Sequence, residues 1–370
     1  MLSSPRISFV MTSRNDDHGG GMTHRMRHCF CSLRDQANLL RWPVELLVVE
    51  WNPPPDRPPL GEVEGFPKSD DWFRFRIVTV AARLHHEFPS ADKIPLFQYI
   101  AKNVGIRRAS ADLILCSNVD VILSDALARY LAHTPLADRR HYRVDRWDVQ
   151  FSDVPTSLAY ELRQELALER LVRVNLRTGS YSREMLGLPD EWPKCATPLA
   201  SAATALAEIE AAAVEREPWQ KDRPHTNACG DFALLSAAAW QQLRGYPEWP
   251  IHSWHIDSVF AAQGRAFGIA EAFLGCDLPI YHIHHDAGWA VCYTDGVSQA
   301  LLDGPRSDGI GFGLAPTEDG YRVEVRTPPM PTLSYIDVLR FEASLRAYGP
   351  VRLNEDSWGM ADRPLAETLM

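Results

Sequence analysis

Short apolar runs alternate with loop-forming and helix-forming segments at the start of the chain. Residues 7–11 (ISFVM) and 44–49 (VELLVV) are β-prone runs, and residues 24–40 between them can hold a helix. Residues 12–21 are polar and rich in glycine, which predicts a loop. Because parallel strands are joined by long crossovers, usually helices, this order predicts a parallel βαβ unit.

The same alternation continues as far as residue 120. A Pro-rich stretch, residues 51–71, predicts a loop, and residues 75–81 predict a further strand. A helix is expected over residues 96–108, followed by a buried strand at residues 113–116. Repeated strands and helices in this order predict an α/β protein.

Composition changes divide the chain into four segments. Residues 1–149 hold the strand–helix repeats, and residues 150–225 contain an Ala/Glu/Leu-rich stretch at 199–217 that predicts a helical insertion. Residues 226–300 hold most of the remaining polar motifs. Residues 301–370 form a Gly/Pro-rich extension with short strands, such as residues 321–325.

Overall composition indicates a globular domain and argues against one class of function. The 370 residues suit one large α/β domain with insertions, since 45% are hydrophobic and 23% are charged. The formal net charge of −10 argues against non-specific nucleic-acid binding, which depends on lysine and arginine neutralising phosphates.

The cysteines and the apolar runs predict the compartment. Seven cysteines are scattered without a Cys-x-x-Cys pair, which indicates neither a disulfide framework nor a structural zinc site. No apolar run approaches the roughly 18–20 residues of a membrane helix, and the N-terminus lacks the pattern of a signal peptide. We therefore expect a cytoplasmic protein without a transmembrane segment.

Polar residues follow the first two predicted strands. Thr12, Arg14 and Asn15 come after the first strand, and Glu50 ends the second. In a doubly wound sheet, ligands bind at the carboxyl edge of the strands, where such side chains can hold the base and ribose of a nucleotide. Polar loops after strands are also common without any ligand, so each cluster taken alone is compatible with a structural role.

The most specific signal follows the predicted strand at residues 113–116. Asn118 and Asp120 follow residues 113–116 and are two residues apart, so in an extended chain both face one side. A carboxylate beside a second oxygen ligand suits a hard divalent cation, which can bridge the phosphates of a sugar nucleotide. The alternative is a turn before a helix that starts at Ser124 and Asp125.

These motifs occur in a known order. The run from residue 7 to residue 120 resembles the donor half of family 2-like GT-A glycosyltransferases. In that pattern a strand ends in Thr-x-Arg-Asn and a second ends in an acidic residue. A helix with Asn-x-Gly-x-x-x-Ala and a strand closing on Asp-x-Asp follow. The matching residues here are Thr12, Arg14, Asn15, Glu50, Asn103, Gly105, Ala109, Asn118 and Asp120.

The resemblance implies a GT-A fold, which is Rossmann-like with a mixed, mostly parallel sheet flanked by helices, and a role for each matching position. Residues 1–149 would bind a nucleotide sugar, with UDP as the nucleotide expected for the family, and Asp120 would bind Mn²⁺ or Mg²⁺. Asn118 stands where the family usually carries an aspartate. The nucleotide-binding residues would be Thr12, Arg14, Asn15, Glu50, Asn103, Arg107 and Asn118, with Lys102 as an alternative to Arg107 at the diphosphate.

Residues 226–300 are similar to the acceptor half of the same enzymes, and the insertion at 150–225 would lie on the acceptor side. A Gly-Asp turn contains Asp231, and Asp257 opens a predicted helix. An inverting enzyme needs a carboxylate that accepts the proton of the acceptor hydroxyl, and we expect Asp257, or else Asp231, to be this base. The alternative for both is a helix N-terminal role.

A histidine run follows residues 278–280. His282 and His284 alternate and would share one face of a strand, with His285 next in sequence. In many GT-A enzymes a late histidine binds the metal or the diphosphate, so either His282 or His284 is a candidate ligand.

The sequence thus predicts a hexosyltransferase-type enzyme that acts on a nucleotide-diphosphate sugar and an unidentified glycan or small-molecule acceptor. One alternative is a degenerate GT-A protein that binds nucleotide or glycan without turnover. Another is a metal-dependent hydrolase, for which the candidate residues are His252, His255, Asp257, His282, His284 and His285.

Overall fold

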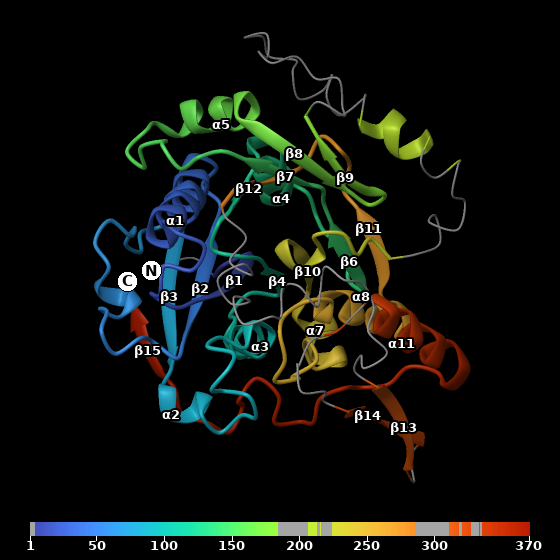
Figure 1. The fold of residues 1–370 in the computed structure, drawn as a ribbon. Coiled ribbons are helices and arrows are strands. Elements are labelled where there is room, and N and C mark those ends of the chain that lie inside the picture. Colours follow the sequence, from blue (N-terminus) through green and yellow to red (C-terminus); the bar gives the residue numbers. More distant parts are fainter. Residues whose placement is uncertain are drawn as a thin grey trace.

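A large mixed sheet forms the centre of the molecule (Figure 1). The computed structural model describes residues 4–183, 206–212, 215, 224–285, 311–317, 320–326, 333 and 335–370. Within these residues eight strands have the order β11-β6-β10-β4-β1-β2-β3-β15. Their bounds are β1 Ile7–Ser13, β2 Val44–Trp51, β3 Phe73–Val80, β4 Leu113–Cys116, β6 Arg140–Arg143, β10 Ala233–Ser236, β11 Ala270–Phe273 and β15 Ala366–Leu369.

Strands β1 to β4 are parallel, so their carboxyl ends share one edge of the sheet. β10 runs antiparallel between β4 and β6, β11 pairs parallel with β6, and β15 pairs antiparallel with β3. The predicted strands at residues 7–11, 44–49, 75–81 and 113–116 are all present, displaced by at most two residues at any end. The predicted α/β fold with a mixed, Rossmann-like sheet is confirmed.

Helices cover both faces of this sheet because side chains alternate along each strand. Phe9 and Leu46 face one layer, whereas Val10 and Leu47 face the other. The first layer holds α1 (Met22–Leu39) and α4 (Asp125–His133). The second holds α2 (Ala82–His85), α3 (Gln98–Arg108), α7 (Ala237–Leu243), α8 (Ile256–Ala266) and α11 (Tyr335–Tyr348). The short helix η1 (Leu60–Glu62) belongs to the first layer, and its Leu60 amide donates to Glu50 of β2.

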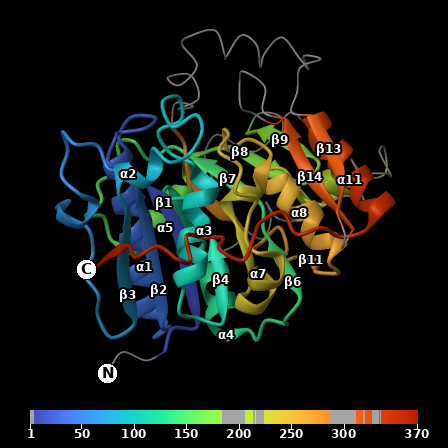
Figure 2. The ribbon, with the colours of Figure 1, turned by 90° about the horizontal axis from the view of Figure 1, so that it is seen from below.

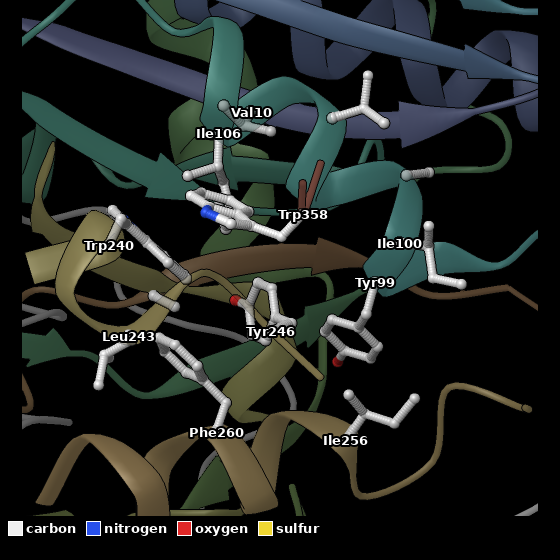
Figure 3. Packing of buried hydrophobic residues seen from close by; sticks show 14 of the residues in the cluster. Val10, Tyr99, Ile100, Ile106, Trp240, Leu243, Tyr246, Ile256, Phe260 and Trp358 are labelled. Atoms are coloured by element: carbon white, nitrogen blue, oxygen red, sulfur yellow. The ribbon is translucent and has the colours of Figure 1, made fainter. Parts of the chain in front are cut away.

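Aromatic packing joins the helices of the second layer (Figure 3). Trp240 stacks on Phe260 with ring centroids 4.7 Å apart, and Tyr246 contacts both rings. The C-terminal segment crosses α3 and α7 before it reaches β15 (Figure 2), and the Trp358 that it carries packs into the same core. The C-terminal residues are therefore part of the fold rather than an appendage.

A second sheet lies beside the carboxyl edge of the first (Figure 1). Its order in the described residues is β5-β12-β7-β8-β9. The strands are β5 Val121–Leu123, β12 Ile280–Ile283, β7 Arg146–Val149, β8 Leu171–Leu176 and β9 Gly179–Ser182, and α5 (Tyr160–Glu169) packs on them. Since β4 ends at Cys116 and β5 begins at Val121, residues 117–120 join the two sheets.

The segment 150–225 is not only helical. It contributes α5 and a helical stretch at 206–212, but it also contains β8 and β9. Of the helix predicted at 199–217, residues 199–205, 213–214 and 216–217 lie outside the described residues. The strand predicted at 321–325 is present as β14 (Gly320–Arg326), paired with β13 (Gly311–Thr317).

Gly105 allows α3 to lie close to the sheet. A Cβ atom at this position would be 2.5 Å from a Val10 methyl and 2.9 Å from a Leu47 methyl, closer than packed atoms allow. Although alanine favours a helix over glycine by about 1 kcal/mol, we expect Gly105→Ala to destabilise the fold by about 1–3 kcal/mol through overpacking. Urea unfolding measures this change, and unchanged or greater stability would contradict the close packing.

Glu45 is a fully buried carboxylate at the start of β2. It accepts hydrogen bonds from Ser8 Oγ (2.5 Å), Arg76 Nη1 (2.7 Å) and the Ser110 amide (2.9 Å). Burial alone would raise the pKa of Glu45, but these donors outweigh it and lower the pKa. The stabilisation is therefore complete above the unfolded-state pKa, near 4 for a glutamate, and is lost as the pH falls through the lower folded-state pKa.

Replacing Glu45 by glutamine tests this pairing. We expect Glu45→Gln to lower the free energy of unfolding by about 2–4 kcal/mol at pH 7, because Arg76 loses its buried partner. The difference from the wild type should shrink at pH 3, because this pH lies below the unfolded-state pKa and the unfolded glutamate takes up a proton. Chemical unfolding of both proteins at the two pH values gives the comparison, and a difference that grows towards pH 3 would contradict it.

Candidate metal centre and active site

Asp120 lies where the two sheets meet. The loop 117–120 is anchored on both sides, since the Ser117 amide donates to the Val10 carbonyl (3.0 Å) and the Ile283 amide donates to the Asp120 carbonyl (2.9 Å). The carboxylate is buried, with 9% of its side chain exposed. It therefore sits at the carboxyl edge of β1 and β4, where ligands of α/β sheets bind.

Two histidines face the Asp120 carboxylate. Oδ2 of Asp120 is 3.2 Å from Nε2 of His285 and 3.8 Å from Nε2 of His282. One ligand atom from each of the three residues lies within 4.8 Å of the others. Oδ1 of Asp120 is buried and has no hydrogen-bond donor within the described part of the chain. A carboxylate with one oxygen that is unpaired among the described residues, and two imidazoles beside the other oxygen, fit a divalent cation.

The surrounding charges keep Asp120 ionised. Burial alone would raise the pKa of Asp120, but His282, His285 and Arg25, whose Nε lies 3.7 Å from Oδ2, outweigh it and lower the pKa. Burial would likewise lower the pKa of His282, but Asp120 and the neighbouring Asp148 outweigh it and raise the pKa. Metal binding at His282 therefore competes with a proton, as at any imidazole ligand.

Asn118 is directed towards Asp231. Nδ2 of the Asn118 side chain donates to Oδ1 of Asp231, and its Oδ1 accepts from Nε2 of Gln98 at 2.9 Å. Arg146 Nη1 contacts Oδ2 of the same Asp231 at 2.6 Å. An aspartate at position 118 would place two carboxylates against each other, so the asparagine suits its neighbour.

Asp257 and Asp231 lie on the two sides of one turn. The turn is η3 (Cys229–Asp231), and a Cβ atom at Gly230 would be 2.9 Å from Oδ2 of Asp257. Asp257 Oδ1 accepts from the Ser258 amide at 2.8 Å in the first turn of α8. Buried Lys102 donates to the Gly230 carbonyl at 2.8 Å. Both predicted catalytic carboxylates thus belong to one neighbourhood.

Several residues predicted to bind nucleotide form hydrogen bonds or ion pairs within the protein itself. Thr12 donates to the Val49 carbonyl (3.1 Å), Asn15 to the Pro58 carbonyl (3.0 Å), and Arg14 pairs with Asp16 (3.4 Å). Glu50 accepts from the Leu60 amide (2.7 Å) and from Thr79 (3.2 Å). These four residues stay at the carboxyl edge of β1 and β2, where they shape the loops.

Asn103 and Arg107 act elsewhere. Asn103 donates to the Tyr246 carbonyl and accepts from the Tyr246 amide, both at 2.8 Å. It therefore ties α3 to the turn after α7. The Arg107 guanidinium lies 4.9 Å from the Trp358 ring centroid and contacts the C-terminal segment. The structure does not bring either side chain to Asp120.

The histidines that face Asp120 are not the pair that strand alternation predicts. His284 is not one of the three converging residues, and His285 supplies the second imidazole because β12 ends at Ile283. His252 and His255, considered for a hydrolase, do not join this group either. The run of histidines at residues 282–285 pointed to His285 in the sequence. No sequence pattern pointed to Asp148 or Arg25, because their distance from the site depends on where β7 and α1 lie.

Comparisons with known proteins do not assign a family. No protein-family model matches the chain. No curated protein matches it. Among the solved structures that match is the crystal structure of S. aureus TarS, with 11% sequence identity and a TM-score of 0.36, covering 78% of this chain. The chain spans 38% of that TarS chain, so less than half of its length.

Proposed function

We propose that this chain transfers a sugar from a nucleoside-diphosphate sugar to an acceptor hydroxyl, with a divalent cation bound by Asp120, His282 and His285. The observation that supports this most is the convergence of these three residues at the carboxyl edge of β4. The cation would supply charge neutralisation for the leaving diphosphate. Because two of its ligands are imidazoles, Mn²⁺ fits this site better than Mg²⁺.

Asp257 is the better of the two carboxylates for the base. Asp231 accepts from Asn118 on one oxygen and is paired with Arg146 on the other, so both of its oxygens are already engaged within the protein. Asp257 forms no ion pair with an arginine or lysine within the described part of the chain, and its contacts are with the Ser258 amide and the Cys229 thiol. Asp257 would accept the acceptor hydroxyl proton, while Asp231, held in place, would orient hydroxyls of the donor sugar.

A turnover assay tests this function. The purified protein is incubated with a panel of UDP-, GDP- and dTDP-sugars and with Mn²⁺, and release of the nucleoside diphosphate is measured. We expect release from one donor, which stops with a chelator and resumes when Mn²⁺ is restored. Donor binding without release would support the alternative of a degenerate, non-catalytic protein, and absence of both binding and release would remove the proposal.

The ligand set also supports a second candidate. Two histidines and one carboxylate bind iron in non-haem enzymes and zinc in hydrolases. The second candidate is therefore a metal-dependent hydrolase or a non-haem iron enzyme. Metal analysis of the purified protein distinguishes it from a sugar transferase, since stoichiometric zinc or iron that resists exchange by Mn²⁺ would favour the second candidate.

A further inference from the structure

His282 lies between two carboxylates. β12 pairs with β7 in parallel, and His282 is directly opposite Asp148 in this register. Nδ1 of His282 is 3.2 Å from Oδ1 of Asp148, while Nε2 of the same ring is 3.8 Å from Oδ2 of Asp120. The two ring nitrogens therefore face different partners, one on each side.

Asp148 is fixed by groups that do not belong to the metal centre. Its side chain is fully buried. Its Oδ2 accepts from Arg173 Nε at 2.8 Å, from Asn175 Nδ2 at 3.3 Å and from Arg146 Nη2 at 3.4 Å, and Arg146 Nε forms an ion pair with Oδ1 at 2.9 Å. These donors come from β7 and β8, two adjacent strands of the second sheet. A carboxylate restrained in this way can hold the ring of its neighbour in one orientation.

We infer that Asp148 is a positioning residue that accepts the Nδ1 proton of His282 and thereby turns Nε2, without a proton, towards a cation bound at Asp120. This inference rests on the proposed metal centre. Histidine ligands commonly donate their second ring N–H to a carboxylate, and removal of such a partner typically costs 10–100-fold in metal affinity or activity.

Metal affinity is the first readout. Mn²⁺ binding is measured by electron paramagnetic resonance, without any nucleotide or acceptor. Asp148→Asn is expected to weaken Mn²⁺ binding about 10–100-fold relative to the wild type. Asp153→Asn is the charge-matched control, since Asp153 is exposed and pairs only with Arg170 at the surface among the described residues. It should bind Mn²⁺ as the wild type does.

The orientation of the ring is the second readout, and it needs only the wild-type fold. Nitrogen NMR of ¹⁵N-histidine-labelled protein with Zn²⁺ as a diamagnetic metal reports which nitrogen carries the proton. The His282 resonances are identified by their absence in His282→Gln. We expect a proton on Nδ1 and metal coordination through Nε2, an arrangement that a purely structural ion pair at Asp148 would not produce.

The outcomes separate this inference from the metal centre itself. Wild-type affinity in a folded Asp148→Asn protein, or coordination of the metal through Nδ1, would overturn the positioning role alone. Absence of Mn²⁺ and Zn²⁺ binding in the wild type would overturn both the metal centre and this role. If Asp148→Asn does not fold, the wild-type NMR result decides.

Discussion

Asp120→Ala is expected to remove cation binding and, with it, sugar transfer. The variant loses the only carboxylate among the three converging residues, which leaves two imidazoles. We expect Mn²⁺ affinity to fall by at least about 100-fold, beyond the effect expected for an outer-shell residue. Transfer should fall by about 1,000-fold or more, since the cation contributes several kcal/mol to the stabilisation of the departing charge.

The fold should tolerate this substitution. Arg25 keeps two acceptors without Asp120, because its Nη atoms donate to the carbonyls of Gly20 and His18. Asp56→Ala, at an exposed residue of the loop after β2, is the control for a lost carboxylate. Circular dichroism establishes folding, and Mn²⁺ titration and product release measure the effect. A folded Asp120→Ala protein with wild-type transfer would remove the metal assignment.

Asp257→Asn is expected to reduce transfer about 100- to 10,000-fold while donor binding is retained. The amide keeps the shape of the side chain and can still accept the Ser258 amide hydrogen bond, but it cannot accept a proton. The defect should therefore appear in kcat and not in the affinity for donor and Mn²⁺. Steady-state kinetics and a donor-binding titration measure the two quantities.

Asp231→Asn is the matched comparison for the base. It removes a carboxylate from the same turn, but one that is already paired with Arg146. We expect this variant to weaken donor binding more than the chemical step. If instead Asp231→Asn lowers kcat and Asp257→Asn loses donor binding, the two roles are exchanged.

Local patterns predicted the sheet and one half of the site. The apolar runs at residues 7–11 and 44–49 become β1 and β2 because strands buried on both faces are apolar throughout. The position of Asp120 followed from the same logic, since it comes directly after a buried strand. His282 was predicted from the alternation of histidines along the strand that forms β12, and it belongs to the converging group. The prediction for His284 differs from the structure, in which His285 takes that place.

The remaining features depend on contacts between distant residues. The pairing of β7 with β12 joins residues about 130 positions apart, so no local pattern shows that Asp148 faces His282. Asn103 belongs to a family-like motif, yet its amide is used by Tyr246, and Arg107 emerges on the side of Trp358. Motif spacing alone does not indicate which polar side chains form hydrogen bonds within the fold and are therefore not available to a ligand.

The most direct test of the central claim is donor binding in the presence and absence of Mn²⁺. Thermal unfolding of the wild type and of Asp120→Ala is followed with a panel of nucleotide sugars, each with Mn²⁺ and with a chelator. The account predicts that one donor at about 100 times its Kd raises the wild-type Tm by about 3–4 °C with Mn²⁺. No such rise is expected with the chelator or in Asp120→Ala. An equal rise with and without metal, in both proteins, would contradict the account.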